Sequence, residues 1–470
     1  MLQIEYKGRF LVTNKSMRDA SLSVIYIVGG VGLAGILQIP LFIGFFVAVC
    51  LMILLLLKRG MSTKEIWEAS LAGMKRTRPV IFILLLTALL IPVWISSGTI
   101  PIMIQIGVQW INPEWIVLVA FLLAATVSFL LGTSIGTLGS LGVVIISVAI
   151  SANVSVPLVA GALISGAFVA ERMSPLSSLF HLVANSVDTH PTQLFRKMVP
   201  SSLLLVGIGI CFYTVLGMNA SPVIPKTDSL YQTLLASHFH SSFISFAPLI
   251  VLFGSIFLRN STLKSLGFGV ATGILVALFY EQVHILALLQ SMVFGYTSSH
   301  DTLALILRGG GLLRMYELIL FICLAGIMNG LLDRTQLFQP LIDQLFRGGM
   351  TITNYTARTV MVTLLLALIG SNQAFPALVA GRSLSGTWGK EGFGREDLGR
   401  VISDTAIVTS GIIPWNMVAI LSTAALGVPT LAYAPYALLL WISPITTIII
   451  SYWLSKTSSF SNQDAHISSR

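Results

Sequence analysis

Long uncharged stretches alternate with short charged ones along the 470 residues of the chain. Asp, Glu, Lys and Arg are all missing from six runs, namely 20–57, 79–113, 115–170, 198–225, 229–258 and 405–455. Each run exceeds the roughly 20 apolar residues that span a bilayer as a helix, and the runs at 115–170 and 405–455 have room for more than one passage. The pattern predicts an all-α polytopic membrane protein that lies in a lipid bilayer.

Apolar segments between turn residues predict about ten full spans and two re-entrant hairpins. The spans are expected near 21–36, 40–57, 79–100, 157–184, 199–217, 242–258, 265–281, 311–331, 400–427 and 434–454. The hairpins are expected at 115–152 and 357–385, because each of these segments carries a polar break near its middle. Two segments that mix apolar and charged residues, 61–77 and 335–347, are interpreted as helices lying in the membrane interface.

Charge supports this layout. Only 10% of the residues are charged, against about 25% in soluble proteins, which argues against a soluble enzyme, a disordered chain or a coiled coil. The layout puts 23 of the 27 Lys and Arg residues on the cytoplasmic side, together with both termini, as the positive-inside rule requires for an inner (plasma) membrane protein. This distribution accounts for the excess of basic residues, so we expect no nucleic-acid partner. Three scattered cysteines predict neither a disulfide framework nor a metal site.

Two regions of the chain resemble each other at a nearly fixed offset. The Gly-Thr-Ser at 132–134 and the Gly-Ser-Asn at 370–372 both follow apolar runs, and Pro175 and Pro414 are 239 residues apart. The first region starts from the cytoplasm and the second from outside, so the repeats have inverted topology, as in many secondary transporters. We expect five parts: a two-span segment with an interfacial helix (1–78), repeat 1 (79–217), connecting spans (218–310), repeat 2 (311–455) and a cytoplasmic tail (456–470).

Glu171 and Arg172 fall near the middle of a span in repeat 1. A charged side chain at that depth costs free energy, and it is retained where it faces a cavity or a partner. Pro175 removes a backbone donor, so the helix should break at 171–175 and free its carbonyls. Carbonyls with a carboxylate suit Na⁺, and the half-helix that begins at Ser177 and Ser178 favours an anion. A structural ion pair is the alternative.

Repeat 2 predicts a second break, between Gly411 and Pro414. Asp404 is the other carboxylate that reaches into a span, although a helix-end ion pair with Arg400 would explain it as well. The hairpin tips add small polar residues at membrane depth, where irregular backbone is tolerated if it lines a cavity. The candidate substrate- and ion-binding residues are Thr133, Ser134, Glu171, Arg172, Ser174, Ser177, Ser178, Ser371, Asn372, Asp404, Thr405, Thr409, Ser410 and Asn416.

Within this set, Na⁺ is expected near Glu171, Asn372 and Asp404. No cofactor is expected, and Na⁺ and H⁺ enter as transported or coupling ions. His181 is interpreted as packed or hydrogen-bonded. The Glu281-x-x-His284 spacing is a weak metal motif.

These motifs resemble the NhaC family of sodium/proton antiporters, which has a sodium–lactate/malate–proton branch. The resemblance covers about 79–455 and rests on Trp94–Pro101, Gly132–Thr137, Gly310–Leu312 with Met315, Arg172–Ser177 and Ile413–Asn416. It implies the inverted-repeat architecture of the ion transporter superfamily, a homodimer and an elevator-like movement of the hairpin domain.

This chain departs from that family at two places. Ser178-Leu179-Phe180 stands where the family has an aspartate and two threonines, and Ser403 stands where it has an acid. A cation ligand is thus missing from each repeat. A less acidic site suits an organic substrate whose own carboxylate Arg172 and the half-helix N-terminus would receive.

Two transport hypotheses follow. The first is a Na⁺(Li⁺)/H⁺ antiporter that works by alternating access, with Glu171 shared between cation and proton. The second is a Na⁺- or H⁺-coupled carrier of a small organic acid or amino acid. A membrane enzyme is disfavoured, because neither His-Glu-x-x-His nor Gly-x-Gly-Asp occurs, and a channel is disfavoured by broken helices in inverted repeats.

Overall fold

The computed structural model describes residues 17–110, 112–219, 239, 242–258, 260–298, 303, 307–335, 338–346 and 351–467. Within these residues, eight helical stretches are long and apolar enough to cross a membrane, and two pairs of helices bent at a short break raise the number to ten. The prediction of an all-α polytopic membrane protein is confirmed. The N-terminal 16 residues, Lys226 and the last three residues of the predicted tail lie outside the described part.

Five helices form the N-terminal part of the described chain. They are α1 (Met17–Ile36), α2 (Leu41–Lys58), α3 (Thr63–Arg76), α4 (Arg78–Ser96) and α5 (Thr99–Trp110). The segment predicted to lie in the interface, α3, continues into α4 after Thr77 and packs along α17 (Tyr316–Thr335). The contact is close because glycines meet there: a Cβ on Gly73 would lie 2.0 Å from the carbonyl oxygen of Gly326. Helices approach this closely in membranes where small residues line both sides.

The first predicted hairpin and broken helix are both present. The hairpin descends through η1 (Pro113–Trp115) and α6 (Ile116–Leu131), turns at Gly132, and returns through α7 (Ser134–Thr137), the π-helical η2 (Leu138–Gly142) and α8 (Val143–Ser151). The broken helix is α9 (Val156–Glu171) followed by α10 (Ser178–Ser186), and α11 (Pro191–Asn219) leads away from it. All residues of α9 from Leu158 to Glu171 are buried, as expected of a helix that is apolar all round.

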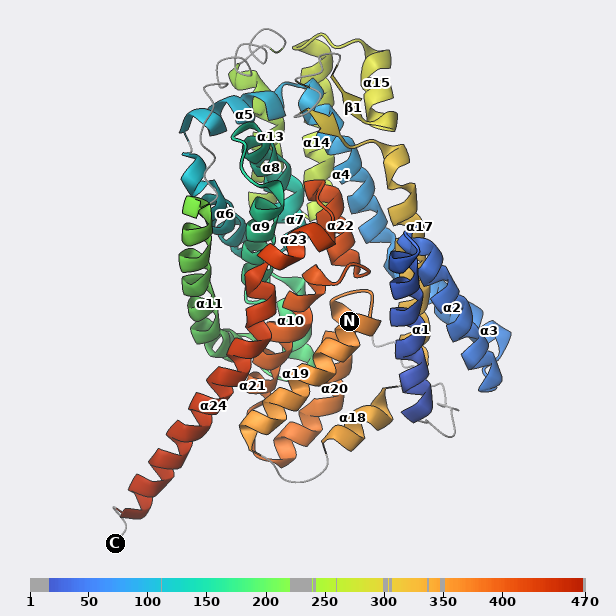
Figure 1. Cartoon of the computed structure of the whole chain (residues 1–470), viewed down its shortest axis with the longest axis vertical. Helices are drawn as coiled ribbons and strands as arrows, with labels where there is room; N and C mark the ends of the chain where they lie inside the picture. Colours follow the sequence, from blue (N-terminus) through green and yellow to red (C-terminus); the bar gives the residue numbers. More distant parts are fainter. Residues whose placement is uncertain are drawn as a thin grey trace.

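The same order of elements recurs in the C-terminal half. The hairpin comprises α19 (Ile352–Ile369) and α20 (Ala374–Lys390). The broken helix comprises α21 (Arg395–Ile402), the π-helical η5 (Ser403–Ile407), η6 (Ser410–Ile412) and α22 (Met417–Leu426), with a bend of 51° between its two halves. It leads through α23 (Thr430–Tyr433) and η7 (Ala434–Tyr436) into α24 (Leu438–Ile467). In Figure 1 the first hairpin lies in the upper half of the molecule and the second in the lower half.

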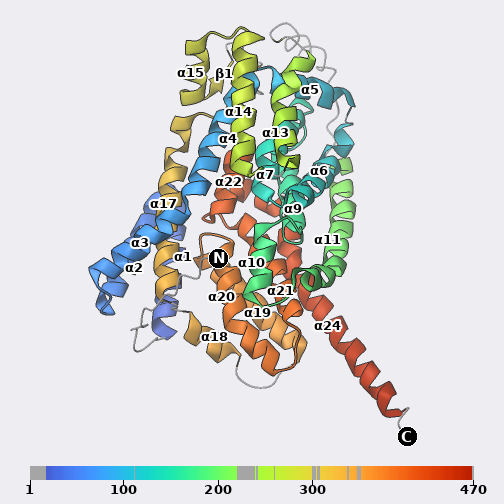
Figure 2. The ribbon, with the colours of Figure 1, turned by 180° about the vertical axis from the view of Figure 1, so that it is seen from behind.

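The two halves interlock. The half-helix α10 packs beside α20 of the second hairpin, and the half-helix α22 packs beside α7 and η2 of the first. Figure 2 shows the same arrangement from behind, with α9, α10 and α22 in the middle of the molecule. The two helix breaks are therefore enclosed between the hairpins.

The remaining elements link the halves and close one end. They are η3 (Phe243–Phe246), α13 (Ala247–Phe257), α14 (Thr262–Phe279), α15 (Ile285–Phe294), β1 (Tyr296–Thr297), β2 (Arg308–Gly309), η4 (Leu312–Met315) and α18 (Gln339–Leu345). The two short antiparallel strands, in which Tyr296 pairs with Gly309, and the helix α15 were not foreseen from the sequence. They lie at the end of the molecule opposite the C-terminus (Figure 1).

Candidate functional site

The tip of the first hairpin is docked onto the first helix break. Helix α6 ends at Gly132, whose φ of +68° is a left-handed conformation that suits glycine. A Cβ at this position would lie 2.5 Å from the backbone carbon of Leu176, so the two segments touch through their main chains. The Ser174 hydroxyl donates to the carbonyl oxygen of Phe129 at 2.6 Å. Ser174, a candidate ligand, therefore fastens the tip to the break.

The tip of the second hairpin is docked onto the second break in a related way. The Trp415 indole Nε1 donates to the carbonyl of Leu368 at 2.7 Å, and the backbone N–H of Met417 donates to the carbonyl of Ser371 at 2.8 Å. Leu368 follows Phe129 by 239 residues, the same offset that separates the two prolines at the breaks. The internal similarity in the sequence thus corresponds to a shared contact between hairpin tip and broken helix.

Glu171 is the last residue of α9, next to the tip of the first hairpin. It is 6% exposed, and its carboxylate faces Ser134 at the start of α7. The hydroxyl and backbone N–H of Ser134 lie close enough to interact with this carboxylate, although neither Glu171 Oε2 nor Ser134 Oγ makes a hydrogen bond of good geometry among the described residues. A buried carboxylate beside a buried hydroxyl with unused hydrogen-bonding capacity is a place where a proton or a small cation would be stabilised.

Arg172 and Asp404 form an ion pair that joins the two broken helices, and both side chains are fully buried. Arg172 also donates from Nη2 to the Ser202 hydroxyl at 3.0 Å. The guanidinium of Arg400 lies 3.6 Å from the other carboxylate oxygen of Asp404. Asp404 is thus held between two arginines, and Arg172 is directed at Asp404 instead of standing free for a substrate carboxylate.

The C-terminal span holds the second arginine in place. Arg400 donates to the hydroxyls of Thr447 and Ser451, the latter at 2.8 Å, and Ser443 donates to the backbone carbonyl of Asp404 at 2.6 Å. Helix α24 therefore supplies a polar face that supports this buried charge network.

Four carboxylates are buried in the described part of the chain, and three of them have a basic partner. Asp19 pairs with Arg59, and Asp397 pairs with Lys197 at 3.1 Å. Asp404 pairs with its two arginines. The fourth buried carboxylate is Glu171, and no basic side chain among the described residues pairs with it. Glu171 therefore has no ion-pair partner of its own, and its carboxylate is open to a bound cation or a proton.

Most of the other candidate hydroxyls and amides serve the backbone. They cap helices or donate to carbonyls one turn earlier, as follows: Thr133 accepts from Gly136, Ser177 from Phe180, Asn372 from Phe375 and Asn416 from Val418, while Thr405, Thr409 and Ser410 donate to Val401, Thr405 and Ala406. Ser178 is exposed at the first turn of α10. These contacts explain the local order of the breaks. Apart from the ion-paired Asp404, they leave Glu171, Ser134 and Ser371 as the candidate ligands whose side-chain oxygens have no hydrogen-bond partner among the described residues.

One residue near the second tip was not among the candidates. The side-chain Oδ1 of Asn329, on α17, accepts from the backbone N–H of Ser371 at 3.1 Å. Polar residues at membrane depth on neighbouring helices are the signal that would have indicated Asn329.

The metal motif and the membrane histidine have other roles. His181 Nε2 contacts the carbonyl of Pro175 at 2.8 Å, in line with the interpretation of a hydrogen-bonded residue. Nδ1 of His284 accepts from the backbone N–H of Leu286 at the start of α15. Glu281 instead lines a pocket of about 610 Å³ with Phe239 and Tyr296. Among the described residues, no group of three or more metal-binding side chains is present.

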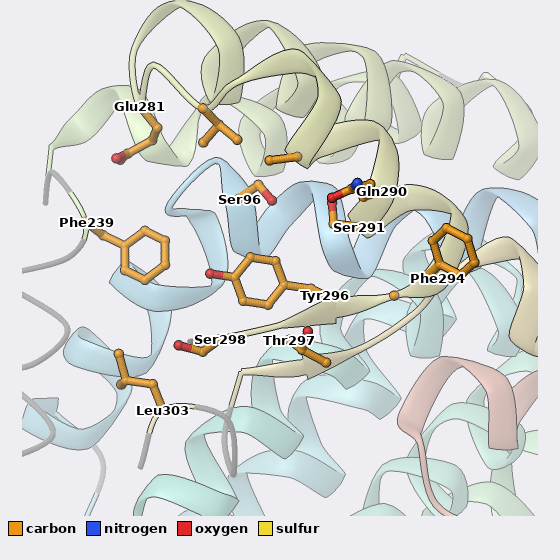
Figure 3. A pocket seen from close by; sticks show the side chains of 13 residues that line it. Ser96, Phe239, Glu281, Gln290, Ser291, Phe294, Tyr296, Thr297, Ser298 and Leu303 are labelled. Carbon is orange, nitrogen blue, oxygen red and sulfur yellow. The ribbon is translucent and has the colours of Figure 1, made fainter. Parts of the chain in front are cut away.

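Figure 3 shows this pocket between α15, β1 and the end of α4. Its lining includes Ser96 and Glu281 but none of the candidate substrate-binding residues. The pocket lies at the end of the molecule that carries α15, whereas the breaks lie at its middle (Figure 1). We therefore keep it apart from the candidate site.

Paired hairpins and broken helices that enclose buried charges are the features of a secondary transporter. A family model described as the Na⁺/H⁺ antiporter family matches residues 9–192 and 172–453. The chain belongs to the Na⁺/H⁺ antiporter family, and the resemblance seen in the sequence is confirmed.

Named relatives agree with this assignment. An "Uncharacterized Na(+)/H(+) antiporter" of Haemophilus influenzae is 30% identical, over 84% of this chain and 86% of its own length. The Na(+)/H(+) antiporter NhaC of Bacillus subtilis is 27% identical, over 89% of this chain and 93% of its own. A "Malate-2H(+)/Na(+)-lactate antiporter" of Bacillus subtilis is 24% identical, over 94% and 98%. The relatives are antiporters, and this chain is a secondary transporter and not an enzyme.

Proposed function

We propose that this protein exchanges Na⁺ or Li⁺ for H⁺ across the plasma membrane by alternating access, with both termini in the cytoplasm. The observation that carries the proposal is the state of Glu171, a buried carboxylate without a basic partner at the end of a broken helix. Membership in the Na⁺/H⁺ antiporter family supports the choice of ions.

The exchange follows from competition for one carboxylate. When Glu171 is ionised, its Oε2 and the Ser134 hydroxyl oxygen offer two ligands to a small cation. When Glu171 is protonated, the charge that attracts the cation is gone. Hard cations such as Na⁺ prefer oxygen ligands of this kind. Proton and Na⁺ therefore exclude each other at Glu171. Each time the site faces one side of the membrane, it releases one of the two ions there and binds the other.

The ion pair between the breaks has a supporting role in this scheme. The Asp404 carboxylate is engaged by two arginines, so we do not include it, or Asn372, in the proposed cation site. The Arg172 guanidinium, although next to Glu171 in the chain, is directed at Asp404 and Ser202. Its positive charge is therefore partly offset by Asp404, which lowers the repulsion that a cation at Glu171 would feel.

We further propose that residues 79–217 and 311–455 are inverted repeats and that the hairpins and broken helices move together against a scaffold of α3, α4 and α17 in a homodimer. The recurrence of the hairpin and broken helix, and the shared 239-residue offset of the tip contacts, support the repeats. The glycine-mediated contact between α3 and α17 supports a rigid scaffold.

The proposal is tested in everted membrane vesicles that carry a pH gradient. Na⁺ and Li⁺ should dissipate the gradient in vesicles with the wild-type protein, and Glu171→Gln should abolish this response. The exposed Glu114 supplies a matched control, since Glu114→Gln changes the same group away from the breaks and should respond like wild type. Full activity in Glu171→Gln vesicles would remove Glu171 from the mechanism.

A second candidate function is coupled transport of a small organic acid. It is favoured by the small number of cation ligands, since three of the four buried carboxylates are neutralised by basic partners. The malate and lactate antiporter among the relatives supports this class of solute. Uptake of radiolabelled L-malate and L-lactate into proteoliposomes, with and without a Na⁺ gradient, separates the two candidates.

A further inference from the structure

Asn329 joins the scaffold helix α17 to the tip of the second hairpin. Its Oδ1 accepts a hydrogen bond from the backbone N–H of Ser371 at 3.1 Å. Since that N–H is a donor, the oxygen of the amide must face it, which fixes the orientation of the amide. The amide nitrogen of Asn329 is consequently directed away from the Ser371 backbone.

Two polar atoms at this contact are buried and have no hydrogen-bond partner among the described residues. They are Nδ2 of Asn329, a residue 6% exposed, and Oγ of Ser371, a residue that is fully buried. Buried polar groups in folded proteins nearly always have hydrogen-bond partners. Two such atoms without partners, on two residues that contact each other, point to a missing ligand.

The chemistry of the pair selects the kind of ligand. An amide nitrogen donates hydrogen bonds and has no lone pair for a cation, so Asn329 Nδ2 is unsuited to Na⁺. The Ser371 hydroxyl has a proton to donate as well. Both groups can donate to an ionised carboxylate, which only accepts hydrogen bonds.

Other groups at the tip do not compete for this role. The carbonyl of Ser371 already accepts from Met417, and Oδ1 of Asn372 accepts from the backbone N–H of Phe375 in the first turn of α20. The buried arginines Arg172 and Arg400 are engaged by Asp404. Neutral donors at the tip are therefore the groups left to receive an anion.

We propose that Asn329 and Ser371 form a binding subsite for the carboxylate of a small organic acid, separate from the proton and cation site at Glu171. This inference rests on the second candidate function above and gives it a location. A carboxylate held there touches both α17 and the hairpin tip. Ligand binding would therefore hold the hairpin against the scaffold and favour one state of the alternating-access cycle.

The test measures equilibrium binding of radiolabelled L-malate and L-lactate to the full-length protein in lipid nanodiscs. Asn329→Asp keeps the acceptor for the Ser371 N–H and replaces the amide donor by a negative oxygen, so binding of the preferred acid should fall at least 100-fold. Ser371→Ala removes one donor and should weaken binding about tenfold. Size-exclusion profiles and thermal unfolding verify that both variants are folded.

Two further variants make the outcome specific. Asn185→Asp introduces the same change at an exposed position of α10 and should leave binding unaltered. Glu171→Gln should lose cation exchange while it still binds the acid, which distinguishes failure of this inference from failure of the exchange mechanism. Wild-type protein that binds neither acid at millimolar concentration, or unchanged binding in both Asn329→Asp and Ser371→Ala, would overturn the proposal and leave a buried water as the occupant.

Discussion

Arg172 and Asp404, 232 residues apart in the chain, form a fully buried ion pair between the two helix breaks. Arg400 adds a second positive charge on the other side of Asp404. With Glu171 ionised, these four buried groups sum to zero charge. The pair therefore connects the repeats structurally and also sets the charge balance in which Glu171 works.

The first prediction concerns the ion pair of Arg172 and Asp404, whose two members should contribute unequally to stability. Asp404→Asn leaves two buried arginines without a carboxylate and should cost about 3–5 kcal/mol of stability. Arg172→Met leaves Asp404 paired with Arg400 and should cost clearly less. Thermal unfolding in detergent measures the difference. Arg395→Met, which removes an exposed ion pair with Asp188, is the control and should change stability by less than about 1 kcal/mol.

The second prediction concerns coupling. If one carboxylate holds either one proton or one Na⁺, the loaded site carries the same charge in both cases, and exchange is one for one. Na⁺ flux driven by a pH gradient should then be insensitive to membrane potential, which valinomycin and K⁺ gradients set in proteoliposomes. A flux that rises steeply with the imposed potential would mean that a further charge moves with the ions.

The third prediction concerns the first hairpin tip. Gly132→Ala places a Cβ in a left-handed conformation and against the backbone of Leu176, so it should destabilise the protein by about 2 kcal/mol or more. Gly207→Ala is the matched control, because a Cβ there meets nothing within 4 Å. Equal melting temperatures for the two variants would show that the tip is not packed against the break.

The fourth prediction concerns the scaffold contact. Gly73→Ala should push α3 away from α17, since a Cβ on Gly73 meets the backbone of Gly326, and should cost about 1–3 kcal/mol. Gly29→Ala, in α1, has open space and should be neutral. Cross-linking of cysteines placed along α3 and α17 reports the separation directly, and an unchanged cross-linking pattern in Gly73→Ala would argue against close packing here.

Helix breaks and hairpins were accessible from the sequence because their causes are local. Pro175 removes a hydrogen-bond donor from its own helix, and Gly132 permits a left-handed turn at its own position. The uncharged runs limit where helices can lie. The predicted hairpins and breaks therefore coincide closely with α6–α8, α19–α20 and the gaps after α9 and η6.

The partners of the buried charges were not accessible, because they come from distant segments. The sequence showed Arg400 one turn before Asp404, but the closer partner, Arg172, lies in the other half. The role expected for Arg172, reception of a substrate carboxylate, gives way to this ion pair. Asn329 escaped notice for the same reason, since its contact with Ser371 depends on how α17 packs against the hairpin.

The most direct test of the central claim is a count of protons released when Na⁺ binds to the purified protein. In weakly buffered solution near neutral pH, Na⁺ added to the wild-type protein should displace protons, up to one per protomer, and Glu171→Gln should release none. Equal proton release from wild type and Glu171→Gln would contradict the assignment of Glu171 as the carboxylate that Na⁺ and H⁺ share.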